Sequence, residues 1–201
     1  MRRRARVEDD PHALHARFLL AMRTAGRPWW NTEEEFGGLD LEGKLECQVD
    51  VSKGLPNGAV ASLAYVHRGA DYLHDKALFD DRFVATLHVD RPQYANLVNS
   101  CLWPILEAFR PYRTQLILDE DLALDDWDAA ITKSGDTGRD EDGRDGMIRL
   151  WPVVFLDDEL CHRALGIGPD MVVNRLTGKV ERVQRCFGGT LIVATSELLD
   201  V

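Results

Sequence analysis

The clearest pattern along the chain lies between Pro92 and Phe109. Apolar side chains recur there at intervals of three and four residues, which places them on one face of a helix. They are Tyr94, Leu97, Val98, Cys101, Leu102, Ile105, Leu106 and Phe109. Pro104 lies inside the pattern, and an internal proline removes a backbone hydrogen bond and crowds the preceding turn. The pattern therefore predicts a long amphipathic helix that is kinked near Pro104.

A second helix is predicted to begin at Pro11. Asp10 is a favourable N-cap, and proline is favoured in the first turn of a helix. Leu14 and Phe18 continue the helical spacing, and Gly26 is typical of the residue just beyond a helix C-terminus. We expect residues 1–10, which begin Met-Arg-Arg-Arg-Ala-Arg, to be a disordered basic N-terminus.

Several short runs are compatible with strands, and two further helices are predicted after Asp157 or Asp158 and after Pro169. The pair Gly188-Gly189 is a signal for a two-residue hairpin turn. Pro152 inside its run indicates an edge strand or a bulge. The predicted strands cover residues 59–67, 82–89, 115–118, 147–156, 180–187 and 190–195. Together these elements predict an α+β fold, in which the long amphipathic helix and shorter helices pack on a mostly antiparallel sheet in a single domain over 1–201.

The composition is that of a folded protein. The 201 residues are 45% hydrophobic and 29% charged, so the chain can bury a core, and disorder throughout the chain or a disulfide scaffold is excluded. No uncharged apolar run approaches the roughly 20 residues that cross a bilayer, so no membrane partner is expected. Glu8, Asp9 and Asp10 occupy the place of the apolar part of a signal peptide, which indicates a cytoplasmic protein.

Acidic residues outnumber basic ones, and they are unevenly placed. Thirty-four acids oppose twenty-four bases, for a net charge of −10, which argues against general nucleic-acid binding. Residues 119–145 contain eleven of the acids, opposed only by Lys133, Arg139 and Arg144, and so carry −8. Such a segment attracts a basic partner and repels phosphate. The alternative is a solvated acidic helix followed by an exposed acidic loop over 134–146, whose charge only keeps the protein soluble.

Candidate chemical motifs are incomplete. Residues 38–44 match G-x-x-x-x-G-K, but Leu45 replaces the metal-binding hydroxyl residue, and Asp40 and Glu42 would repel phosphates. Asp157, Asp158 and Glu159 are adjacent carboxylates that suit either a divalent metal or, as we favour, the start of a helix. Neither the cysteines nor the histidines have the spacing of a metal site, so we predict no catalytic residue, metal or cofactor. These residues are Cys47, Cys101, Cys161, Cys186, His12, His15, His67, His74, His88 and His162.

Two adjacent tryptophans, Trp29 and Trp30, follow Pro28. Aromatic side chains are enriched at the centres of binding interfaces because they contribute a large area at little entropic cost. Adjacent side chains do not easily point into one core, so one ring can be exposed for binding. Alternatively, a loop can bury both rings between layers of structure.

The end of the chain resembles a known family. The segments that carry the resemblance are Leu156-Asp-Asp-Glu-Leu-Cys-His-Arg-Ala-Leu-Gly-Ile-Gly-Pro, Leu176-Thr-Gly-Lys-Val-Glu-Arg-Val and Gly188-Gly-Thr-Leu-Ile-Val-Ala-Thr. They are similar to the C-terminal part of bacterial polymorphic-toxin immunity proteins and resemble the family called immunity protein 52. The resemblance implies a cytoplasmic antitoxin of interbacterial competition, which binds one cognate toxin or effector domain and blocks its active site or substrate groove. No functional residues carry over from the family.

An acidic inhibitor would fit a toxin whose groove is basic. The predicted partner-binding residues are Asp125, Asp126, Trp127, Asp128, Asp140, Glu141, Asp142, Trp29 and Trp30. Two other classes stay open: a small metal-dependent hydrolase that uses Asp157, Asp158 and a histidine, and a non-catalytic adaptor or structural protein.

Overall fold

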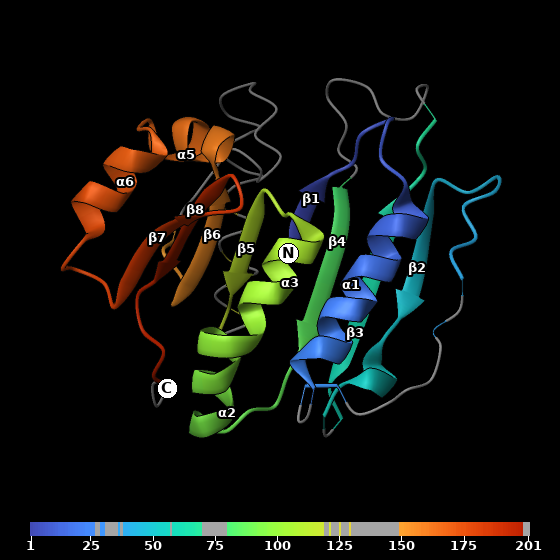
Figure 1. Cartoon of the computed structure of the whole chain (residues 1–201), viewed down its shortest axis with the longest axis horizontal. Helices are drawn as coiled ribbons and strands as arrows, with labels where there is room; N and C mark the ends of the chain where they lie inside the picture. Colours follow the sequence, from blue (N-terminus) through green and yellow to red (C-terminus); the bar gives the residue numbers. More distant parts are fainter. Residues whose placement is uncertain are drawn as a thin grey trace. The chain divides into compact units, whose positions relative to one another are not determined.

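A computed structural model of the chain describes residues 1–26, 29–30, 36, 38–56, 58–69, 80–118, 121, 125, 129 and 149–198 (Figure 1). The chain divides into two compact units, one formed by residues 1–110 with the C-terminal residues from Glu197, the other by residues 111–196. Each unit combines antiparallel strands with helices, as expected for an α+β fold. That residues 1–201 fold as a single domain stays a prediction.

The first unit is built on four antiparallel strands in the order β2-β3-β4-β1. They are β1 (Arg2–Arg4), β2 (Glu46–Asp50), β3 (Val60–Val66) and β4 (Asp80–Thr86), with a short 3-10 turn, η1 (Ser52–Gly54), after β2. Leu63 at the centre of β3 pairs with Val49 on β2 and Phe83 on β4. Because side chains alternate across a strand, these three residues share one face, and all three are buried.

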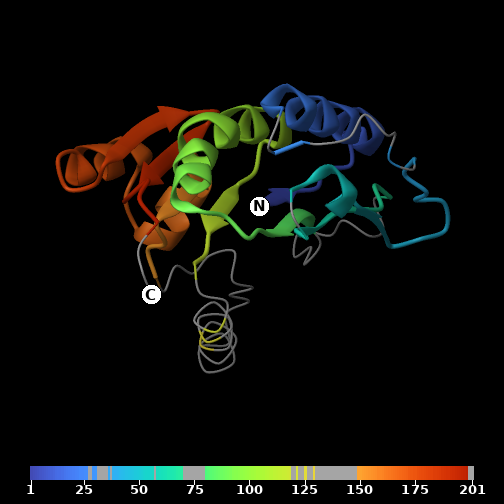
Figure 2. The same cartoon turned by 90° about the horizontal axis from the view of Figure 1, so that it is seen from below.

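The helical segments of the first unit are α1 (Pro11–Ala25), α2 (Arg91–Asn96), the π-helical segment η2 (Leu97–Cys101) and α3 (Leu102–Phe109). Of these, α1 and α3 contribute side chains to the core on that face. Asp10 caps α1 by accepting hydrogen bonds from the backbone N–H groups of His12 and Ala13. In Figure 2, α1 and α3 lie on the same side of the strands. Phe18 on α1 is fully buried against Phe83 and Phe109, so the helices and the sheet share one apolar core.

The predicted amphipathic helix is present but interrupted. Residues 91–109 are nineteen consecutive helical residues, of which the central five have π-helical hydrogen bonding. The N–H of Leu102 bonds to the carbonyl of Leu97, five residues earlier. Pro104 explains the irregularity, because its ring has no N–H to donate and crowds the carbonyl of Ser100. The helix is therefore two shorter α-helices joined by a π turn.

The second unit has its own four strands in the order β5-β6-β8-β7. They are β5 (Arg113–Leu116), β6 (Val153–Asp157), β7 (Arg182–Cys186) and β8 (Gly189–Val193). The helices α5 (Asp158–Leu165) and α6 (Pro169–Leu176) follow β6 along the chain. Their apolar faces form a second buried core with the strands, made of Tyr112, Trp151, Val154, Leu156, Leu160, Cys161, Val172 and Ile192.

The C-terminal hairpin is present, with its turn one residue earlier than predicted. Cys186 pairs with Gly189, so the two turn residues are Phe187 and Gly188, both with positive φ (49° and 74°). Positive φ at both positions is typical of the turns that match the twist of a hairpin. Gly189 is instead the first residue of β8, and a Cβ there would lie 2.4 Å from the carbonyl oxygen of Leu156. Close approach of two backbones, not the turn, requires this glycine.

The prediction of a disordered basic N-terminus is wrong for Arg2–Arg4, which form β1 beside β4. The physical reason is charge pairing, because the paired residues of β4 include Asp80 and Asp81. The predicted acidic loop over 134–146 lies outside the described residues. Among the helices that the structure describes, none is long and apolar enough to cross a membrane.

Candidate partner-binding surface and buried charge cluster

Two of the acids in the segment 119–145 are described, and both are exposed. Asp121 and Asp125 are helical, as is the exposed Ala129. Residues four apart in a helix lie on the same side, so both carboxylates belong to one exposed helix face. Asp125 is therefore at the surface, and its role in partner binding stays a prediction. The remaining predicted acids of this segment, with Trp127, lie outside the described residues: Asp126, Asp128, Asp140, Glu141 and Asp142.

Trp29 and Trp30 are both buried, with 2% and 5% of their surface exposed. Trp29 donates a 2.6 Å hydrogen bond from Nε1 to Oδ1 of Asn96, at the end of α2. The ring of Trp30 packs into the first core beside Phe36 and directly over Gly54, where a Cβ would lie 2.5 Å from the ring. The structure therefore has both rings buried, and their role in partner binding stays a prediction that this burial does not support.

A cluster of buried charges lies where β1 meets β4. The carboxylate of Asp81 is completely buried, and its Oδ2 accepts hydrogen bonds from Arg3 (3.1 Å) and Arg68 (2.5 Å). Its Oδ1 accepts a bond from the backbone N–H of Val66 at 3.2 Å. The neighbouring Asp80, also buried, is paired with Arg2 at 3.7 Å. The cluster anchors β1 by placing each arginine beside a carboxylate that would otherwise be buried without a counter-charge.

Asp9 extends this cluster toward the start of α1. Its Oδ2 accepts a 2.8 Å bond from Arg3 and a 3.0 Å bond from the backbone N–H of Arg6. Burial opposes ionisation of Asp9, but the hydrogen bond and charge of Arg3 outweigh it and hold the pKa of this carboxyl below its usual value. The pKa of Arg3 is raised because its bonds to Asp9 and Asp81 outweigh the opposing effect of burial. Both groups are therefore charged at neutral pH.

A buried histidine and tyrosine lie beside the same cluster. Nδ1 of His15 on α1 is 3.2 Å from the hydroxyl of Tyr65 on β3, and the two rings meet edge to face. Burial, reinforced by the charge of His12, lowers the pKa of His15. Burial and the carboxylate of Asp81 raise the pKa of Tyr65 far above its ordinary value. Both side chains are therefore neutral at neutral pH, and the pair contributes no charge to the core.

Because the pKa of His15 is lower in the folded chain than in the unfolded one, acidification favours unfolding. The unfolded state binds more protons, so we expect the free energy of unfolding to fall as the pH drops below about 6.5. In the His15→Gln variant, which keeps a hydrogen-bonding group without this titration, the decline between neutral and mildly acidic pH should be smaller. Urea denaturation at several pH values measures it. If the free energy of unfolding falls equally in the variant, the titration of His15 is not the cause of the decline.

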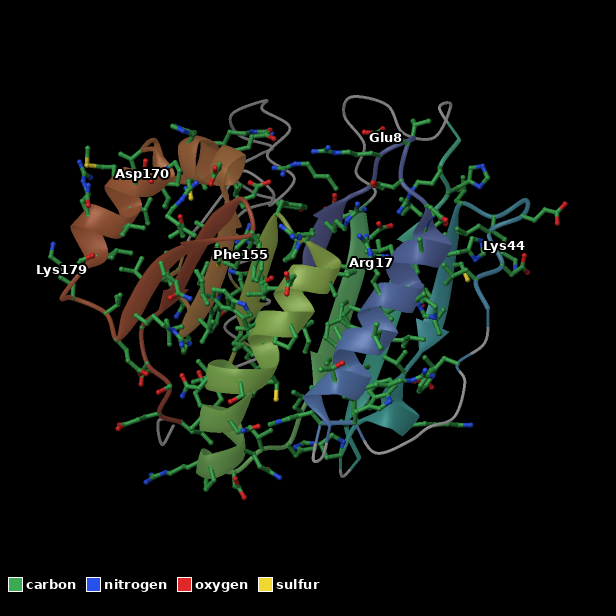
Figure 3. All side chains as sticks on the ribbon, in the orientation of Figure 1. Glu8, Arg17, Lys44, Phe155, Asp170 and Lys179 are labelled. Carbon is green, nitrogen blue, oxygen red and sulfur yellow. The ribbon has the colours of Figure 1, made fainter. Side chains whose placement is uncertain are left out.

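Asp157 and Asp158 begin a helix, as we favoured from the sequence. Oδ1 of Asp157 accepts a 2.7 Å bond from the N–H of Leu160, which is the geometry of an N-cap. Asp158 forms an ion pair with Arg185 on β7, with nitrogen–oxygen distances of 2.7 and 2.8 Å. Arg185 also lies 3.7 Å from Asp170, at the start of α6 (Figure 3). These contacts tie the starts of α5 and α6 to the hairpin.

The near-match to a phosphate-binding loop lacks the required local structure. Lys44 pairs with Asp40 in an exposed loop (Figure 3), and the next element is the strand β2. A phosphate-binding loop instead leads into a helix, whose N-terminal N–H groups bind the anion. Cys101 and Cys161 are buried, and burial raises the pKa of both thiols, in Cys101 to about 11. Both are therefore protonated at neutral pH and pack as small apolar residues.

In the part of the chain that the structure describes, no group of three histidine, cysteine or carboxylate side chains is placed to hold a metal ion. The described units define an α+β protein of antiparallel sheets covered by short helices. Comparison with known proteins found no matching family model, no matching curated protein and no matching solved structure.

The Asp81 cluster was not predicted from the sequence. The available signal was the complementarity of two short runs, three consecutive arginines at Arg2–Arg4 and two consecutive aspartates at Asp80 and Asp81. Their separation along the chain is large, and only the pairing of β1 with β4 brings them together.

Proposed function

We propose that this protein is an immunity protein, which binds a cognate bacterial toxin or effector domain and neutralises it by occluding the active site or substrate groove. The observation that carries the proposal is the concentration of negative charge in residues 119–145, a net −8, with Asp121 and Asp125 on one exposed helix face. A basic groove would be attracted to this surface over several ångströms, which accelerates encounter.

The resemblance of the last fifty or so residues to polymorphic-toxin immunity proteins supports the same class. In this proposal the protein acts in the cytoplasm, beside its toxin, and needs no metal or cofactor. The acids would occupy the place of the toxin's own substrate. They would do so electrostatically, because a patch that repels phosphate mimics a phosphate-rich ligand to a basic groove.

The test begins with capture of the partner by the tagged full chain in its native cells, followed by expression of the captured domain alone. We expect that domain to arrest growth, and co-expression of this chain to restore it. A captured partner that does not arrest growth would indicate an adaptor instead. Retained metal together with hydrolase activity, both lost in the Asp158→Ala variant, would indicate an enzyme.

The acidic surface is tested by reversing its charge. Replacement of Asp125, Asp126 and Asp128 by lysine should slow association with the captured toxin by about ten- to a thousandfold. This slowing should be smaller at high salt than at low salt, because salt screens the charges. A control variant reverses Glu8, Glu42 and Glu107, three exposed acids elsewhere, and changes the net charge equally. Association that is slowed equally in both variants, or in neither, would remove the segment from the binding site.

A further inference from the structure

The outer edge of β2 presents unpaired backbone groups in a regular order. The N–H of Val51 bonds to the carbonyl of Ala61 at 3.0 Å, and the N–H of His67 bonds to the carbonyl of Leu45 at 2.8 Å. In an antiparallel pair, residues alternate between those that bond to the partner strand and those that face away from it. Val51 and Leu45 face β3, so the intervening Glu46, Gln48 and Asp50 direct their N–H and carbonyl groups outward.

This edge is accessible in the described structure. β2 is the outermost strand in the order of the first unit. Gln48 and Asp50 are exposed and Glu46 is half-buried. Among the described residues, no backbone hydrogen bond reaches the outward groups of these three positions. An extended chain alongside β2 would satisfy them, as in other proteins that bind a peptide by adding a strand to a sheet.

The charges of the edge determine which chain fits. Glu46, Gln48 and Asp50 point to one face of the sheet, so the edge carries a carboxylate at each end. Glu46 is already paired with Arg82 across β3 at 2.5 Å, while Asp50 accepts a 2.8 Å bond from the N–H of Ser52. The hydrogen bonds to Ser52 keep the pKa of Asp50 below its usual value, so this carboxyl is charged at neutral pH.

A second copy of this chain is a poor occupant. Antiparallel pairing of two β2 strands about Gln48 would place Glu46 of each copy opposite Asp50 of the other, and parallel pairing in register would align identical acids. Like charges directly opposite each other destabilise a strand pair. A segment that carries lysine or arginine at alternate positions would instead place its cations opposite these acids.

We propose that the edge of β2 binds an extended segment of a partner protein with basic side chains at alternate positions, which adds a strand beside Glu46–Asp50. The inference concerns a different surface from Asp121 and Asp125, and it stands independently of the proposed function. Backbone hydrogen bonds to Glu46, Gln48 and Asp50 would provide the affinity, and Glu46 and Asp50 the selectivity for charge.

The test uses the full chain and a blocked peptide of strand length in which lysine alternates with valine. Hydrogen exchange followed by NMR should reveal protection of the amides of Glu46, Gln48 and Asp50 on addition of the peptide. The amides of Cys47 and Val49, already bonded to β3, should change little. The amides of β7, the edge strand of the second unit, should also stay unchanged, because β7 carries no acidic side chain to attract lysine. Protection of every second amide along β2 distinguishes strand addition from attraction by charge alone.

Gln48→Pro is the matched variant, because it removes an outward N–H and leaves the bonds between β2 and β3 in place. We expect it to weaken binding about tenfold. Asp50→Asn, which keeps an acceptor for Ser52, should weaken binding of the lysine peptide and reduce its advantage over a glutamate counterpart. The protection pattern of the unmodified protein needs no variant, so it decides the question even if Gln48→Pro does not fold.

Three results would overturn the proposal. The first is the absence of alternating protection at saturating peptide. The second is equal binding of a peptide whose central valine is replaced by proline, which would indicate charge alone. The third is a dimer of the protein by itself in sedimentation experiments that Gln48→Pro abolishes, which would identify a second copy as the occupant.

Discussion

Replacement of Asp81 by alanine is expected to lower the free energy of unfolding by about 3–5 kcal/mol. Asp81 is fully buried and is the shared partner of two guanidinium groups, those of Arg3 and Arg68, whose side chains are only 13% and 10% exposed. The variant would leave these cations with one fewer counter-charge in a largely dry environment, and the N–H of Val66 without its acceptor. Most of the loss is the cost of that uncompensated burial, not the intrinsic strength of the pairs.

The measurement is urea denaturation, with hydrogen exchange of the backbone amides as a local readout. β1 should lose protection before the rest of the first unit, because Arg3 is held to β4 partly through Asp81. Asp40→Ala provides the comparison, since it removes an ion pair between exposed side chains, and its denaturation midpoint should not change. A loss below about 1 kcal/mol for Asp81→Ala would mean that water or rearranged acids replace the carboxylate.

Replacement of Phe18 by alanine is expected to cost about 3–5 kcal/mol as well, for a different reason. The ring of Phe18 lies between β4 and α3, with ring centroids 4.8 Å from Phe83 and 5.6 Å from Phe109. Its removal would leave a cavity among three elements that do not easily close around it, so the lost packing adds to the lost burial of apolar surface.

Leu20→Ala on the same helix is the control for this prediction. Leu20 is 63% exposed, so its truncation removes few contacts, and alanine is a good helix former. We expect a change within about 0.5 kcal/mol. Thermal or urea unfolding, followed by circular dichroism, measures both variants. A similar loss in both would indicate that the helix itself, not the packing of Phe18, determines the stability of α1.

Features that depend on neighbouring residues were predicted well. Asp10 caps α1, Asp157 caps α5, and the C-terminal hairpin forms, because a cap or a tight turn is decided within a few residues. Pro104 disturbs its helix as its chemistry requires, although as a π turn and not as the kinked α-helix that was expected. For the candidate site, Asp125 is exposed, and its part in binding stays a prediction.

Features that depend on distant residues were missed. Most helices and strands, the amphipathic faces and the acidic segment could be predicted because they depend on the spacing and charge of neighbouring residues, whereas β1 and β2 were not predicted. The strand at Arg2–Arg4 is visible in the folded chain alone, because the stabilising carboxylates of Asp80 and Asp81 lie far away in the sequence. The burial of Trp29 and Trp30 likewise depends on distant residues, because Asn96 and Gly54 form their surroundings. The position of β2 at an edge follows from strand order, which is a property of the assembled sheet.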